Sequence, residues 1–171
     1  MQRFKLNYDR QVREYVASTS SGSLIERSLD PKEALEKLSK KYYRQLEKKI
    51  GGKLKDLFNQ LEPIRVITWI NDKGCLRVAV FVQELTKDNY LTLSTEWRAK
   101  VKMKLEQERF LLPFSVEFGS GEELEKIEVI ERAFEILGHD WQAAVKSLDF
   151  ILRGFVGPWV VWMEYLLRDR E

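Results

Sequence analysis

Hydrophobic residues have the spacing of strands in some segments of this chain and the spacing of helices in others. Together these patterns predict an α+β fold. Residues 64–70 are rich in β-branched and aromatic side chains, and residues 76–82 alternate in polarity. The Asn-Asp-Lys-Gly turn at 71–74 joins them, which predicts an antiparallel hairpin. A third strand is expected over 111–118. Residues 86–109 fit both a helix and an edge strand, and helix is favoured because good helix formers dominate the later part.

A long amphipathic segment precedes the hairpin. Asp30 and Pro31 have the residue types of a helix cap and a first helical position. Behind them, apolar side chains at helical spacing form one stripe over residues 35–61. Gly51-Gly52 interrupts this stripe, and a glycine pair is a common helix stop. The pattern therefore predicts two helical segments or one kinked helix, with two segments favoured, ending before the proline at position 63.

The amino-terminal region is predicted to be a short helix followed by a linker. Apolar residues of segment 3–17 have helical spacing, although Phe4, Leu6 and Tyr8 also alternate as in a strand. The serine-rich segment 17–23 is typical of a flexible joint and lacks the glycine and lysine pattern of a phosphate-binding loop.

Capping residues predict three short helices in the last third of the chain. Ser120 begins a capping box, Asp140 has the residue type of a second cap, and Gly157-Pro158 is typical of a third helix start. The whole pattern is divided into a helix and joint at 1–29, a basic helix with a ββαβ core at 30–119, and an acidic, tryptophan-rich three-helix segment at 120–171. These three parts are expected to form one domain.

The ββαβ core carries a resemblance to a known family. From Cys75 to Phe118, a strand, a helix and a Leu-Leu-Pro-Phe segment leading into a strand follow in order. This run resembles the soluble carboxy-terminal α/β region of small mechanosensitive channels, with Ser115 where their motif has a second proline. The resemblance implies a ferredoxin-like ββαβ element and nothing about channel function.

The charge is distributed unevenly along the chain. The net charge is only +2, from 29 Lys/Arg and 27 Asp/Glu. Residues 1–110 contain 23 Lys/Arg and 15 Asp/Glu, a net charge of +8, whereas residues 111–171 contain 6 and 12, a net charge of −6. A basic face attracts nucleic acid, acidic protein or anionic lipid. Alternatively, the two regions neutralise each other within one chain or between copies.

No segment has the composition of a secretory signal or a membrane span. The most apolar run, residues 150–167, is interrupted by Arg153 and Glu164, which leaves ten uncharged residues between them. A spanning helix needs about 18 or more. We therefore expect a soluble, cytoplasmic protein.

The residues that could carry nucleophilic or metal chemistry are few. Cys75 is the one cysteine and His139 the one histidine, and neither lies in a catalytic motif. Glu128, Glu131 and Glu135 could form an acidic ridge on one helix, but a solvated helix face explains them better. The sequence thus predicts no cofactor and no metal, and it favours a protein that is not an enzyme.

The clearest positive signal is a row of basic residues. The candidate nucleic-acid contacts share one side of the predicted first helix; they are Lys37, Lys40, Lys41, Arg44 and Lys48. A row of this kind can neutralise phosphates. The alternative is a solvated helix with pairs such as Glu33–Lys37. Three further lysines at 100, 102 and 104 would widen the patch if they faced the same way.

Aromatic side chains near the carboxy-terminal end supply a second candidate surface. The candidate partner contacts are Phe155, Trp159, Trp162 and Met163. These residues offer more apolar area than a short helix usually buries, so either core packing or docking of a partner or second copy would explain them.

The leading functional hypothesis is a non-enzymatic adaptor or assembly subunit that binds protein partners or self-associates. The alternative is a nucleic-acid-associated protein that uses the basic helix over residues 37–55. An enzyme with a carboxylate site that the sequence does not reveal comes third.

Overall fold

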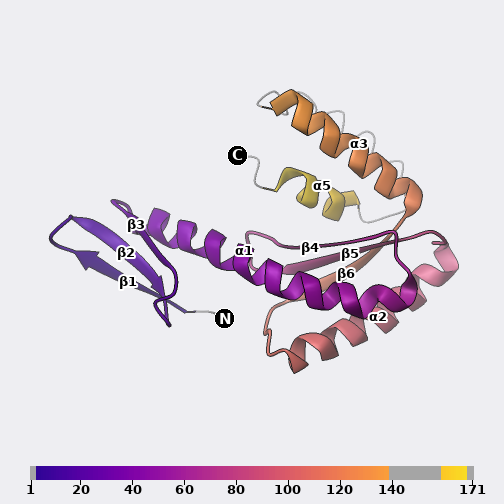
Figure 1. Ribbon diagram of the computed structural model, residues 1–171, viewed down its shortest axis with the longest axis horizontal. Coiled ribbons are helices and arrows are strands. Elements are labelled where there is room, and N and C mark those ends of the chain that lie inside the picture. Colours follow the sequence, from indigo (N-terminus) through magenta and orange to yellow (C-terminus); the bar gives the residue numbers. More distant parts are fainter. Residues whose placement is uncertain (1–2, 139–158, 169–171) are drawn as a thin grey trace.

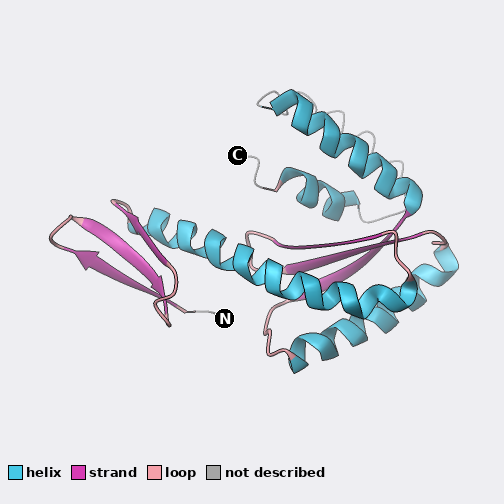
Figure 2. Cartoon of the chain, in the orientation of Figure 1, coloured by secondary structure: helices cyan, strands magenta, loops and turns pink. Residues whose placement is uncertain are grey.

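The computed structural model describes residues 3–138 and 159–168, and it has a mixed α+β fold (Figures 1 and 2). Two three-stranded sheets are connected by one long helix, α1. The chain thus begins with three strands, where the sequence predicted a helix and a linker.

The amino-terminal sheet is an antiparallel meander. Its strands are β1 (Phe4–Asp9), β2 (Glu14–Thr19) and β3 (Ile25–Ser28). The predicted helix over 3–17 is wrong, because the alternation from Phe4 to Tyr8 prevails and residues 10–13 form a turn that ends with Arg13 at φ 56°. The predicted serine-rich linker is instead the turn between β2 and β3, in which Gly22 has φ 73° and donates to the Thr19 carbonyl at 2.9 Å.

Helix α1 (Pro31–Phe58) is one continuous helix, and a short 3-10 turn (Asn59–Leu61) follows it. The predicted cap is present, since Asp30 accepts a hydrogen bond from the Lys32 amide at 2.9 Å. The predicted break at Gly51-Gly52 is wrong. A Cβ atom at Gly51 would lie 3.0 Å from Thr68 Oγ1, so this glycine allows the helix to pass close to the second sheet.

The second sheet contains the hairpin that the sequence predicted. Strands β4 (Arg65–Ile70) and β5 (Leu76–Val82) are antiparallel, and β6 (Phe114–Ser120) lies parallel to β5. Helix α2 (Lys87–Gln107) makes the crossover between β5 and β6, which settles residues 86–109 in favour of helix. The strand order β4-β5-β6 makes β4 an edge strand. A ββαβ order is therefore present, whereas a ferredoxin-like arrangement is not confirmed in detail.

Helices cover both faces of this second sheet (Figure 1). The even-numbered positions of β4 and β5 pack against α1 and α2, through residues such as Val78, Phe58 and Trp97. The odd-numbered positions pack against α3 (Gly121–Leu137) and α5 (Trp159–Leu167), where Phe81 contacts the core of these helices. In the described part of the chain, β4 has a neighbouring strand, β5, on one side only, so its outer edge is not covered by another strand.

The carboxy-terminal helices agree with the predicted boundaries where the structure describes them. Ser120 caps α3 by accepting from the Glu123 amide at 3.2 Å, and α5 begins next to the predicted Gly-Pro start. The helix predicted after Asp140 lies outside the described residues. Among the helices that are described, none is both long enough and apolar enough to cross a membrane.

A candidate anion-binding groove beside helix α1

Three adjoining hollows follow one side of α1. Hollow A lies beside the Lys32–Tyr43 part of the helix and has a volume of about 450 Å³. Hollow B, about 380 Å³, lies beside Lys40–Glu47, and hollow C, about 570 Å³, lies beside Glu47–Lys55. Hollows A and B share Lys40, Tyr43 and Asp72, and hollows B and C share Glu47 and Arg168. We call these three adjoining hollows together the α1 groove.

The α1 groove has walls from distant parts of the chain. Helix α1 forms one wall along its whole length, and the edge strand β4 with the turn after it contributes the floor. The end of α5 forms the second wall of hollows B and C, through Leu167, Tyr165 and Arg168. The groove is therefore two-sided only where α5 packs on the sheet.

Cationic side chains outnumber acidic ones along the groove. Nine cationic residues line the three hollows: Lys32, Lys40, Arg44, Lys48, Lys55, Arg65, Lys73, Arg77 and Arg168. Four acidic residues line them: Glu36, Glu47, Asp72 and Glu164. Arg65 is paired with Glu128 and Glu131 of α3, which lie outside the three hollows, and an excess of positive charge remains without it. A concave surface with such an excess favours an anionic ligand.

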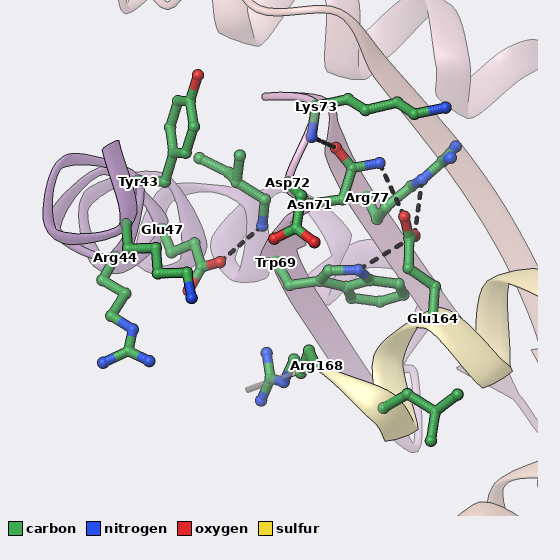
Figure 3. Close-up of a pocket in the computed structure, with 13 residues that line it drawn as sticks. Tyr43, Arg44, Glu47, Trp69, Asn71, Asp72, Lys73, Arg77, Glu164 and Arg168 are labelled. Atoms are coloured by element: carbon green, nitrogen blue, oxygen red, sulfur yellow. Dashed lines mark hydrogen bonds and ion pairs between the residues drawn. The ribbon is translucent and has the colours of Figure 1, made fainter. Parts of the chain in front are cut away.

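Two of the four acidic residues have structural partners at the β4 edge. Glu47 accepts a hydrogen bond from the Ile70 backbone amide at 2.7 Å, which satisfies a donor on this edge strand. Glu164 of α5 accepts from Trp69 Nε1 at 3.3 Å, Asn71 Nδ2 at 2.8 Å and Arg77 Nε at 3.0 Å (Figure 3). These bonds attach α5 to β4 and β5, so Glu164 fixes the second wall of the groove.

Arg65 has a similar structural role in hollow C. Its guanidinium pairs with Glu131 at 3.2 Å and Glu128 at 3.5 Å on α3, and donates to the Tyr165 hydroxyl at 3.3 Å. Burial alone would lower the pKa of Arg65, but the charges of Tyr165, Glu131 and Glu128 raise it. Two members of the predicted acidic ridge therefore neutralise an arginine.

The structure divides the predicted row of nucleic-acid contacts. Lys40 and Arg44 line hollow B, and Lys48 lines hollow C. Lys37 instead pairs with Glu33 at 2.8 Å, and Lys41 pairs with Glu26 on the amino-terminal sheet. These last two residues lie next to the meander rather than in the groove.

The lysines of α2 do not join the groove. Lys100 pairs with Glu96 at 3.1 Å and lies 4.2 Å from the Trp97 ring centroid, and Lys104 pairs with Glu108 at 3.4 Å. Glu108 also pairs with Lys53, on the α2 side of α1. The cations that complete the groove are instead Lys73, Arg77 and Arg168. They come from the β4–β5 turn, from β5 and from the residue after α5, so no local pattern could have placed them beside α1.

Among the candidate partner contacts, Trp162 lies in the protein core. Its side chain is 1% exposed, packs 5.0 Å from the Phe81 ring centroid, and donates to Glu123 Oε2 at 2.8 Å. Met163 is half-buried against the same core. Phe155 and the side chain of Trp159 lie outside the described residues.

The other candidate chemistries gain nothing from the structure. Cys75 is half-buried beside the β4–β5 turn, where its amide donates to Asn71 Oδ1 at 2.9 Å. His139 lies outside the described residues. Within the described ranges 3–138 and 159–168, no three His, Cys, Asp or Glu side chains are grouped as metal ligands.

One carboxyl group is buried away from the groove. Glu123 is 6% exposed in the first turn of α3, where it accepts from Trp162. Burial raises the pKa of Glu123, and the hydrogen bonds from Trp162 and Ser120 lower it less than burial raises it. Ionisation of this group therefore opposes folding.

This burial predicts a pH dependence of stability. Because the folded-state pKa is raised, the contribution of Glu123 to the free energy of unfolding is largest below its unfolded pKa of about 4.3 and declines as pH rises through the folded value. Glu123→Gln should remove that decline, so the variant should gain stability relative to wild type as pH rises above about 4.3. Urea unfolding of both proteins across a pH series measures this difference in the free energy of unfolding. The exposed Glu125 of the same helix provides a control, Glu125→Gln, and parallel curves for wild type and Glu123→Gln would contradict the expectation.

Comparison with models of protein families, with characterised proteins and with solved structures gives no match. The resemblance of residues 75–118 to mechanosensitive channels thus gains no support. The α1 groove is the structural feature that bears on function.

Proposed function

We propose that this protein binds nucleic acid in the α1 groove, through contacts with the phosphate backbone. The supporting observation is the row of three adjoining hollows beside α1, lined by nine cationic and four acidic side chains. From Lys32 to Lys55 the helix advances about 35 Å at 1.5 Å per residue, which is long enough to follow a strand over several nucleotides. Positively charged grooves of this kind track a nucleic-acid backbone without reading sequence.

The charges in the groove favour this function over the adaptor hypothesis. Glu47 and Glu164 both bond to the β4–β5 hairpin. Arg65 and Arg77 are paired with carboxylates as well, whereas Lys48 and Lys55 are exposed. The adaptor hypothesis depended on an aromatic surface near α5, and Trp162 is part of the core instead. The adaptor function therefore has less support than the alternative.

Two double variants that have the same net charge as each other test the proposal. Lys48→Gln/Lys55→Gln removes two cations from hollow C, whereas Lys49→Gln/Lys102→Gln removes two exposed cations that do not line the three hollows. We expect the first variant to weaken binding to a fluorescent single-stranded oligonucleotide. The slope of log affinity against log salt concentration should fall by about 1 for each lysine.

The matched variant should retain the wild-type affinity and slope to within a few tenths of a unit. Equal losses for the two variants would show that only net charge matters. No salt-dependent binding by the wild-type protein would overturn the proposal.

A further inference from the structure

Hollow B differs from the rest of the α1 groove in its chemistry. Its apolar wall consists of Tyr43, Trp69, Ile70 and Leu167, from three different elements. Its cations come from both walls, Arg44 from α1 and Arg168 from directly after α5, and both side chains lie in the lower part of Figure 3. Its volume of about 380 Å³ falls within the usual range of roughly 300–1,000 Å³ for small-molecule sites.

Asp72 gives this hollow a hydrogen-bond acceptor. It is exposed on the β4–β5 turn, and in Figure 3 its carboxylate lies between Glu47 and Trp69, toward the interior of the hollow. Unlike Glu47 and Glu164, Asp72 has no hydrogen bond or ion pair from its side chain within the described residues. A carboxylate here repels a bare phosphate but accepts hydrogen bonds from an amino group.

The turn that carries Asp72 is held in one conformation. Asn71 Oδ1 accepts from the Lys73 and Cys75 amides at 3.0 and 2.9 Å, and Asn71 Nδ2 donates to Glu164. Gly74 has φ 77°, and a Cβ atom there would lie 2.8 Å from the Tyr43 hydroxyl, so α1 packs closely on the turn. The fold therefore fixes the backbone that carries Asp72 relative to the apolar wall.

From this combination we infer that hollow B binds one nucleotide of a single strand whose base carries an exocyclic amino group. The inference rests on the proposed function. The base lies against Tyr43 and Leu167, its amino group donates to Asp72, and the adjoining phosphate lies near Arg44 and Arg168. Adenine, cytosine and guanine have such an amino group, whereas thymine and uracil have none, and carboxylates accept from the cytosine amino group in known complexes. The chain should therefore prefer oligo-dC to oligo-dT.

Competition binding with oligo-dC and oligo-dT of equal length tests this inference. Both are pyrimidine strands with the same backbone charge, so the ratio of their affinities isolates the base. We expect wild type to bind oligo-dC about five- to tenfold more tightly, which is the discrimination of one good base contact. Asp72→Ala should bring the ratio close to one, while the lost negative charge raises both affinities.

A control separates the amino-group contact from the charge. Glu106→Gln removes an exposed acidic residue of α2, outside the three hollows, and should leave the ratio unchanged. Equal binding of the two oligonucleotides by wild type, or an unchanged ratio in Asp72→Ala, would overturn the inference about hollow B. Salt-dependent binding of both strands would still support the proposed function, whereas binding of neither would overturn the proposed function itself.

Discussion

Trp162→Ala is expected to lower the free energy of unfolding by about 3–5 kcal/mol, the usual cost of truncating a buried tryptophan. The substitution leaves a cavity beside Phe81, and it also deprives the buried Glu123 carboxylate of its hydrogen bond from the indole. Glu123 keeps its hydrogen bonds from Ser120, so the lost indole bond adds to the cost without leaving the carboxyl group unsatisfied, and we expect the loss to fall within that range. Denaturant unfolding followed by far-ultraviolet circular dichroism measures the loss.

A second residue of α5 provides the control for this prediction. Val160 is 62% exposed, so Val160→Ala should change stability by no more than about 0.5 kcal/mol. Sedimentation of Trp162→Ala should show the wild-type mass. A reduced mass with little loss of stability would mean that Trp162 contacts a second copy, and it would return the adaptor hypothesis to first place.

The second large effect is expected at Gly119 of β6. A Cβ atom at this position would lie 2.6 and 2.7 Å from two Phe81 ring atoms and 3.1 Å from Trp162 Cζ2. Gly119→Ala should therefore force these rings apart and cost about 1–3 kcal/mol, the usual range for overpacking a core. Thermal unfolding or urea unfolding of the purified variant measures the change.

The same substitution at another glycine should have the opposite sign. A Cβ atom at Gly52 meets nothing within 4 Å, and this residue lies inside α1, so Gly52→Ala should stabilise the protein by about 0.5–1 kcal/mol. Adding Phe81→Leu should reduce the penalty of Gly119→Ala, because the smaller side chain vacates the contested space. Additive effects of these two substitutions would contradict the steric explanation.

Local signals in the sequence predicted the elements with well-defined ends. Asp30-Pro31, Ser120 and the Asn-Asp-Lys-Gly turn each determine a cap or turn through contacts within a few residues, and the structure has all three features. Gly51 misled the prediction because its role depends on Thr68, 17 residues away. At the amino terminus, the helical spacing of Phe4, Tyr8 and Val12 is also compatible with two strands and a turn.

The groove was predictable only on its α1 side. Lys40, Arg44 and Lys48 are close in sequence, so helical periodicity placed them together. The floor and the opposite wall depend on Lys73 and Arg168. The packing of α5 on the β4–β5 hairpin brings these two residues together in hollow B. Periodicity carries no information about such a contact, because it arises from tertiary packing.

The attachment of α5 has a consequence for the order of folding during synthesis. Glu164 bonds to Trp69, Asn71 and Arg77 across 95, 93 and 87 residues of chain, whereas the meander pairs neighbouring strands. Contacts between distant residues form late because loop closure must precede them, and a nascent chain folds from its amino terminus. A ribosome-bound chain that lacks residues 159–168 would thus present the lysines of α1 with only one wall, and the proposed nucleotide site would form only after these residues have been synthesised and packed.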